Sequence, residues 1–206
     1  MEPAWLKWAK ELAAISQNGL MYANNAYDIE RYEKIRQIAA EMMSAPSGLD
    51  TESLLTILAK EDGYATPKVD VRGVVFRDNK ILLVKEKIDN KWTLPGGWAD
   101  PCDCPSESVV REIYEESGFE TQAQKLLAVY DRSKHPHEPS MPFHIYKLFF
   151  LCEITGGSEQ ISHETTAVDF FAEDQIPELS VSRVLPYQIV RMFEHYHNPD
   201  MPTDFD

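Results

Sequence analysis

The stretch GWADPCDCPSESVVREIYEESGF, residues 97–119, contains the pattern that decides the fold. Its second half predicts a helix from Pro105 to Ser117, because proline is tolerated in a first helical turn and Gly118 suits a helix end. A short strand over residues 92–94 and the turn Pro95-Gly96-Gly97 come immediately before this segment. The chain therefore contains a strand, a loop and a helix in direct succession.

Three glutamates of the predicted helix, Glu112, Glu115 and Glu116, are three and four positions apart, so Glu112 faces both others across one turn. One interpretation is an ordinary solvated acidic face. The preceding glycines favour a second one, because residues without a Cβ let backbone carbonyls turn into a site. Clustered carboxylates beside a carbonyl offer hard oxygen ligands, which suit Mg²⁺ or Mn²⁺ rather than zinc.

The segment resembles the signature of the Nudix hydrolases, G-x(5)-E-x(7)-R-E-U-x-E-E-x-G-U, where U is bulky and apolar. Asp103 stands where the pattern has glutamate, and Cys102 where many members have glycine. The other fixed positions match in register: Gly97, Arg111, Glu112, Ile113, Glu115, Glu116, Gly118 and Phe119. The resemblance covers residues 67–197 and implies an α+β fold, in which a mixed sheet lies between helices as an α/β/α sandwich.

By this resemblance, the metal ligands would be Glu112, Glu115, Glu116 and the carbonyl of Gly96, and Arg111 would orient the glutamates. The departure at Asp103 falls at a position that mostly braces the loop. The implied reaction is hydrolysis of a nucleoside diphosphate linked to another group, by a water activated by Mg²⁺ or Mn²⁺.

The general base of that reaction is open at this point. Glu164, in His163-Glu164-Thr165-Thr166, matches the place where many Nudix members carry a catalytic glutamate. Glu115 and Glu116 are alternative bases. A solvated loop glutamate is the structural alternative for Glu164.

Candidates for substrate contact lie outside the signature. The period-two pattern over residues 69–76 places Arg72 opposite a valine face, where it could contact phosphate or base, or form a structural ion pair. Further candidates for the substrate wall are Lys85, Trp98, Tyr130, Arg132 and His135.

The first 63 residues are predicted to be all helical. The expected helices are residues 3–18, ended by Gly19; Asp28 to Ser44, ended by the breaker Ser44-Ala45-Pro46-Ser47-Gly48; and a third from the cap Asp50 to near Gly63. This region resembles the extension found before one Nudix subgroup, whose members are described as ADP-ribose or CDP-choline pyrophosphatases. We expect a domain over residues 1–63 that forms a homodimer or part of the substrate wall.

The remaining elements complete a Nudix domain over residues 67–197. Asp78-Asn79 predicts a turn between strands 69–76 and 81–84. Further strands are expected at residues 120–131, 143–154 and 168–171. A last helix is expected from a cap at Ser182 to His197, followed by a frayed tail over 198–206.

Composition excludes several classes of function. The 206 residues hold 20 Lys and Arg against 34 Asp and Glu, a net charge of −14. Such a surface disfavours nucleic acid and membranes as partners. Neither an apolar run of membrane-spanning length nor a secretion signal is recognisable, and the three cysteines give no disulfide framework, so a cytoplasmic protein with free thiols is expected.

Two other functions stay open. A house-cleaning enzyme that releases pyrophosphate from nucleoside triphosphates would use the same helix. A nucleotide sensor without catalysis would have no need for three carboxylates at metal spacing.

Overall fold

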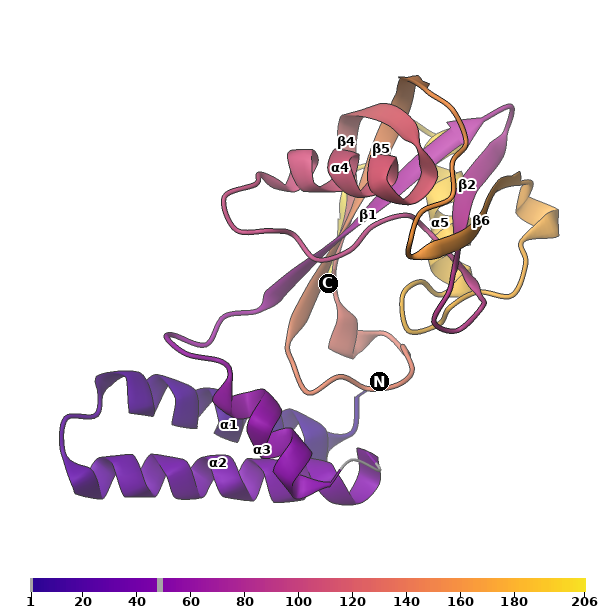
Figure 1. Cartoon of the computed structure of the whole chain (residues 1–206). Helices are drawn as coiled ribbons and strands as arrows, with labels where there is room; N and C mark the ends of the chain where they lie inside the picture. The colour runs from indigo at the N-terminus through magenta and orange to yellow at the C-terminus, as the bar shows by residue number, and fades with distance from the viewer. Residues whose placement is uncertain (1, 48–49) are drawn as a thin grey trace. The chain divides into compact units, whose positions relative to one another are not determined.

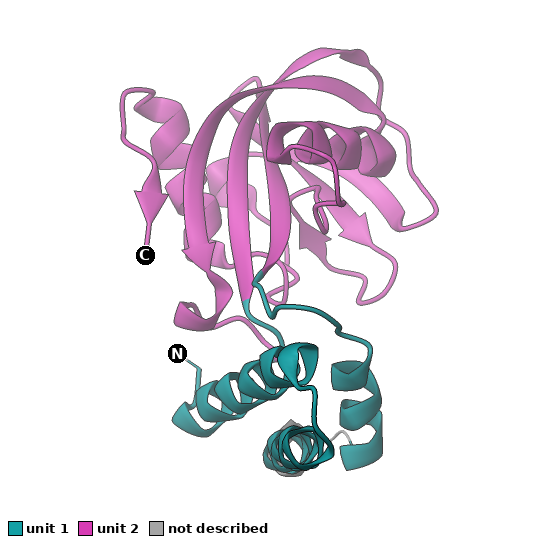
Figure 2. Ribbon diagram, turned by 90° about the vertical axis from the view of Figure 1, so that its left-hand side faces the viewer, with its two compact units in different colours: residues 1–67, 140–144 teal, residues 68–139, 145–206 magenta. Residues whose placement is uncertain are grey.

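The computed structural model describes residues 2–47 and 50–206. The chain divides into two compact units, residues 1–67 with 140–144 and residues 68–139 with 145–206 (Figure 2). Within the described residues, no helix combines the length and the apolar character needed to cross a membrane.

The first unit contains the helices α1 (Ala4–Tyr22), α2 (Ala26–Ser47) and α3 (Thr51–Ala59). Asp50 caps α3 as predicted, because its side chain accepts a 2.8 Å hydrogen bond from the Ser53 amide. The core of this unit consists of Leu6, Ala9, Ala40, Met43, Leu54 and Leu58.

Several predicted helix boundaries in this unit are wrong. α3 ends at Ala59 and not near Gly63, and α2 begins at Ala26, so Asp28 lies inside its first turn and is not its cap. α1 continues through Gly19, where an added Cβ would lie 2.3 Å from the Tyr32 ring. Gly19 thus allows the two helices to approach closely and does not end one. α2 continues past Ser44 to Ser47, and Gly48 of the predicted breaker lies outside the described residues.

The second unit is built on a mixed sheet with the strand order β3-β2-β1-β5-β4-β7, and β6 pairs with β2. β1 runs parallel to β5, and β2 runs antiparallel to β6. The predicted turn between β1 and β2 is confirmed, since Asp78 and Asn79 have φ of 53° and 58°. The strands are β1 (Lys68–Arg77), β2 (Lys80–Glu86), β3 (Trp92–Thr93), β4 (Phe119–Asp131), β5 (Ile145–Gly157), β6 (Thr165–Phe171) and β7 (Asp204–Phe205).

Helices cover both faces of this sheet (Figure 1). Because successive strand residues point to opposite faces, Val75 packs with Ile113 of α4 (Pro105–Ser117), whereas Val74 packs with Phe193 of α5 (Pro186–His197). The predicted α/β/α sandwich is therefore confirmed.

The C-terminal segment differs from the prediction. α5 begins at Pro186 after Leu185, and not at a Ser182 cap. The tail is not frayed, because β7 pairs with β4 and Asp204 accepts a 2.7 Å hydrogen bond from Arg191 Nη2. A strand pairing and an ion pair with α5 hold the end of the chain in place.

Candidate active site

The helix α4 has the predicted ends. Pro105 occupies its first turn, and the carboxylate of Glu107 accepts a 3.0 Å hydrogen bond from the Cys104 amide. Gly118 ends the helix in the left-handed conformation with a φ of 78°. Val109 and Ile113 pack one side of α4 against the sheet. This packing holds the three glutamates of α4 beside the sheet.

Glu116 is the most deeply buried glutamate of α4, with 5% of its surface exposed. Its Oε2 accepts a 2.8 Å hydrogen bond from the Gly96 amide. Its backbone carbonyl accepts a 3.0 Å hydrogen bond from the Thr165 hydroxyl of β6. Burial raises the pKa of Glu116 to about 8, although the charge of Arg72 and the Gly96 amide act in the opposite direction.

The two glycines before the loop are required by close contacts. Gly96 has a φ of 142°, and a Cβ there would lie 2.0 Å from the Val71 carbonyl oxygen. A Cβ at Gly97 would lie 2.8 Å from Oε2 of Glu112. Without side chains at these two positions, the turn over residues 95–97 can pass between β1 and the carboxylates of α4.

The guanidinium of Arg111 lies close to four carboxylates, two on α4 and two in the loop before it. It lies 3.0 Å from Asp100 and 3.4 Å from Asp103. It also lies 2.9 Å from Glu112 and 3.2 Å from Glu115. Arg111 thus contacts two of the three glutamates that it was predicted to orient, and it joins them to the loop that Asp103 was predicted to brace.

The loop contains a further constraint at Cys102, whose φ is 77°. This left-handed conformation is unusual for a residue with a Cβ and explains why glycine is common at this position in the Nudix signature. The free thiols of Cys102 and Cys104 are exposed.

Within residues 2–47 and 50–206, no group of three or more His, Cys, Asp or Glu side chains is arranged to hold a metal ion. Oxygens of Glu112 and Glu115 contact Arg111, and Glu116 accepts from Gly96. The donor chemistry nevertheless fits a hard divalent cation, because Glu116 is buried with no ion pair among the described residues and Glu112 is half-buried beside it. Ligation by these glutamates and by the Gly96 carbonyl stays a prediction.

Glu164 lies close to the C-terminal end of α4 but is exposed. Its carboxylate lies 3.1 Å from His163 Nε2. Its carbonyl accepts a 2.9 Å hydrogen bond from the Lys87 amide, and the next residue, Thr165, is bonded to the Glu116 carbonyl. The backbone thus holds Glu164 near the glutamates, and its role as general base stays a prediction.

Arg72 forms the structural ion pair that was the alternative to substrate contact. Only 3% of its surface is exposed, and its Nε and Nη2 lie 2.9 and 2.7 Å from the carboxylate of Asp70. Its Nη1 donates to the Leu94 carbonyl at 3.1 Å. Lys147 Nζ donates to the same carboxylate at 2.6 Å, which completes a buried triad. The geometry therefore does not support Arg72 as a substrate ligand.

Three other substrate candidates make contacts near the chain end or in adjacent loops. Tyr130 donates to Asp204 at 3.1 Å, and Arg132 donates to the Pro139 carbonyl at 2.7 Å. His135 Nε2 lies 3.1 Å from Asp206. A role for these residues at the substrate stays a prediction.

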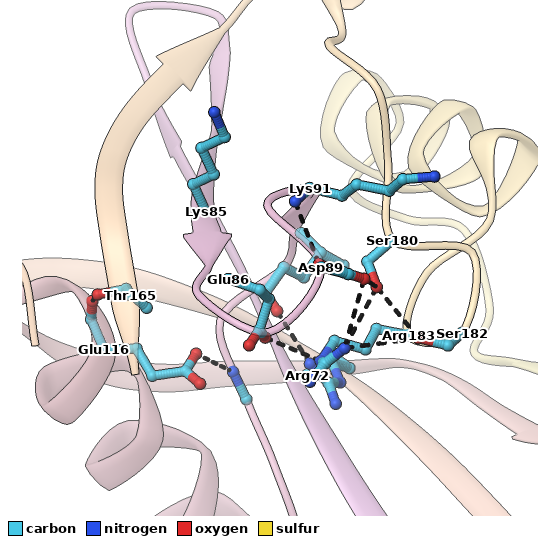
Figure 3. A network of polar contacts seen from close by, with 12 residues as sticks. Arg72, Lys85, Glu86, Asp89, Lys91, Glu116, Thr165, Ser180, Ser182 and Arg183 are labelled. Atoms are coloured by element: carbon cyan, nitrogen blue, oxygen red, sulfur yellow. Dashed lines mark hydrogen bonds and ion pairs between the residues drawn. The ribbon is translucent and has the colours of Figure 1, made fainter. Parts of the chain in front are cut away.

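The remaining two candidates, Lys85 and Trp98, are at least partly exposed. Figure 3 shows the Lys85 side chain on the side of β2 away from Glu86 and Glu116. Trp98 pairs with Asp70 through an isolated backbone bridge and has 45% of its surface exposed. Both stay predictions as parts of the substrate wall.

The sequence argument missed two charged residues that Figure 3 places in the same network as Arg72, namely Glu86 and Arg183. Glu86 ends β2 and lies 2.8 Å from Arg183 Nε. The period-two pattern could have identified Glu86, because it shares the face of Leu82 and Val84, which pack in the cluster below α4. No local signal marks Arg183, which lies in the loop before α5.

Known proteins match the whole chain. Residues 66–191 match the family model described as NUDIX domain, and residues 3–58 match the one described as UDP-X-like, N-terminal oligomerisation domain. The Bacillus subtilis (strain 168) protein named "Putative ADP-ribose pyrophosphatase YjhB" is 45% identical over 206 residues, which cover 100% of this chain and 99% of the relative.

Solved structures agree with these matches. A UDP-X diphosphatase is 33% identical with a TM-score of 0.64, and the match covers 98% of each chain. An ADP-ribose pyrophosphatase from Streptococcus suis 89-1591 is 34% identical with a TM-score of 0.60, over 68% of this chain and 100% of that chain. With a matching family model over most of its length, its α/β/α sandwich and the signature glutamates on α4, the chain belongs to the Nudix hydrolase family.

Proposed function

We propose that this Nudix pyrophosphohydrolase cleaves the pyrophosphate bond of a nucleoside diphosphate linked to a sugar or alcohol group, in a reaction that requires Mg²⁺ or Mn²⁺. The observation that carries the proposal is the single turn of α4 that aligns Glu112, Glu115 and buried Glu116 beside the Pro95-Gly96-Gly97 turn. The names of the full-length relatives support the substrate class, since they refer to ADP-ribose and UDP-linked compounds. CDP-choline stays a candidate from the sequence resemblance.

Each residue has a distinct part in this proposal. A divalent cation at the glutamates would polarise the phosphate oxygens and acidify an attacking water. Glu112, Glu115 and Glu116 would hold that cation, and Arg111 keeps two of these glutamates in place. Glu164 accepts the proton of the water, with Glu115 or Glu116 as the alternative base.

A substrate panel tests the proposal. The purified protein is incubated with ADP-ribose, a UDP-sugar, CDP-choline and nucleoside triphosphates in Mg²⁺ or Mn²⁺, and products are identified by mass. We expect a nucleoside monophosphate and the phosphorylated partner group from at least one of the linked substrates. A Glu112→Gln variant is the control for contaminating phosphatases.

Two results would select the alternatives. Release of pyrophosphate from triphosphates alone would favour the house-cleaning activity. Tight nucleotide binding without turnover of any compound would favour a sensor.

We further propose that the chain forms a homodimer through α1. Trp8, Ile15 and Tyr22 follow one another at intervals of seven residues and have 57%, 53% and 68% of their surfaces exposed. This spacing places them along one side of the helix. An exposed apolar stripe favours association, and the model matching residues 3–58 is described as an oligomerisation domain.

Charges placed on this stripe are expected to separate the dimer. In the full-length chain, the double change Trp8→Glu and Ile15→Glu should shift the mass in light scattering from two chains to one. Lys7→Glu is the matched control, because Lys7 is exposed on the same helix beside the stripe. A double variant that keeps the dimer mass would exclude this surface.

A further inference from the structure

Glu86 is a buried carboxylate on the same face of the sheet as α4. It is the last residue of β2 and has 6% of its surface exposed. The strand alternation places it in line with Leu82 and Val84, which pack in one cluster with Val109 and Ile113. A carboxylate that continues an apolar row is costly to bury unless it has a partner or a function.

Thr165 connects Glu86 to the glutamates of α4. The register between β2 and β6 shifts between Lys85 and Glu86, so that Glu86 pairs with Thr165. The hydroxyl of Thr165 donates to the carbonyl of Glu116 at 3.0 Å. Glu86 and Glu116 therefore flank one residue, and Figure 3 shows their carboxylates directed toward the same region.

Arg183 is the counter-ion of Glu86. Its Nε lies 2.8 Å from Glu86 Oε1, and its Nη1 lies 3.8 Å from Asp89. The loop that carries Arg183 is fixed to the β2–β3 connection, since Ser180 donates to Asp89 at 2.6 Å and to the Trp92 carbonyl at 2.8 Å. This frame holds the guanidinium over the carboxylate.

One carboxylate near Glu86 lacks an arginine partner of its own. Burial raises the pKa of Glu86, with opposition from the charge of Arg183. Arg72, which also lies nearby, is already paired with Asp70. Arg183 pairs with Glu86 and Arg111 pairs with Glu112, whereas Glu116 has no ion pair among the described residues.

We infer that Glu86 is a further acidic group of the divalent-cation site, and that Arg183 partly neutralises its charge while no cation is bound. The inference rests on the proposed function, because it extends the site that the glutamates of α4 form. The alternative is that Glu86 and Arg183 form only a structural ion pair that fastens the loop before α5.

The two interpretations predict different signs for a pair of substitutions. If Glu86 adds negative charge to the cation site, Glu86→Gln weakens Mn²⁺ binding, whereas Arg183→Gln removes a competing positive charge and strengthens it. If the pair is only structural, both changes break the same contact and shift Mn²⁺ affinity in the same direction or leave it unchanged. The measured affinity of the cation therefore separates the interpretations without any activity assay.

The experiment measures Mn²⁺ binding to the full-length, metal-free protein by electron paramagnetic resonance of free Mn²⁺. We expect Glu86→Gln to weaken binding by about tenfold, the usual size of the effect for a residue that supports a metal site. Arg183→Gln should strengthen it on the order of threefold. Asp89→Asn is the matched control, because it removes a carboxylate charge near Arg183 and is expected to change the affinity by less than about twofold.

The experiment distinguishes failure of this inference from failure of the proposed function. If the unchanged protein binds Mn²⁺ and hydrolyses a linked nucleoside diphosphate while Glu86→Gln binds Mn²⁺ equally well, the inference is overturned and the proposed function stands. If Glu112→Gln also leaves Mn²⁺ binding intact, the cation site itself is misplaced and both fail. A melting temperature for each variant shows whether the fold is kept.

Discussion

Excess chelator is expected to reduce hydrolysis of a nucleoside diphosphate substrate by at least about 10³-fold, because a bound cation contributes several kcal/mol of charge stabilisation in phosphoryl transfer. The chain has a net charge of −14, and its glutamates cannot by themselves hold a pyrophosphate. The arginines closest to them, Arg111 and Arg72, are paired with carboxylates. Neither is free to replace a cation.

The measurement compares initial rates before and after removal of metal, with back-titration by Mg²⁺, Mn²⁺ and Ca²⁺. Rates should return with Mg²⁺ or Mn²⁺, which shows that the chelator removed a cation and did not unfold the protein. Undiminished turnover in excess chelator would contradict the catalytic assignment of α4 as a whole.

Glu116→Gln is expected to lower turnover by about 10²- to 10⁴-fold. This is the range for loss of a side chain that takes part in proton transfer in the transition state. The amide is isosteric and its oxygen can still accept from the Gly96 amide, so the fold is kept. At pH values where Glu116 is ionised, the variant removes a buried charge and the like-charge repulsion along α4. We therefore expect a melting temperature equal to or above that of the unchanged protein.

This difference in stability should depend on pH. Because the pKa of Glu116 is raised to about 8 from its ordinary value of 4.5, the folded protein retains a proton that the unfolded chain releases. The corresponding stability is complete below pH 4.5 and is lost as the pH rises through about 8. In metal-free protein, the melting temperature of Glu116→Gln should exceed that of the unchanged chain increasingly from pH 5 to pH 9, by several degrees.

Parallel melting curves at five pH values measure this effect. Glu107→Gln is the control, since Glu107 lies on the same helix but is exposed. Curves for Glu116→Gln and the unchanged chain that stay parallel across the range would show that the Glu116 carboxylate is ionised in the folded protein. If Glu116→Gln hydrolyses the substrate as fast as the unchanged protein, Glu116 is not part of the active site.

The arrangement of the residues at the centre of the candidate site could be predicted because its determinants are local in the sequence. Helix geometry alone aligns Glu112, Glu115 and Glu116, and the glycines of the preceding turn lie only a few residues away. Arg111 and Asp103 lie in the same short segment, so their contact also follows from one loop and one helix. Helices and strands with a clear hydrophobic period and clear capping residues could be predicted for the same reason.

The remainder depends on pairings between distant segments. Arg183 reaches Glu86 only because the loop before α5 is fastened to the β2–β3 connection. Asp70 and Lys147 enclose Arg72 because β1 and β5 pair in parallel, with Asp70 directly opposite Lys147. A period-two pattern shows which face Arg72 occupies, but not that a carboxylate two positions earlier would take up its charge.

The docked tail has a consequence for aggregation. The outer edge of β4 would present unpaired backbone groups to other chains, and such edges promote sheet-to-sheet association. β7 covers this edge at Ala128 and Val129, and Lys125 donates to the tail carbonyls of Pro199 and Met201 at 2.6 Å each. The irregular register of β4 near Lys125 also makes it a poor template for a foreign strand. Residues 199–205 therefore protect this edge of the sheet from uncontrolled addition of foreign strands.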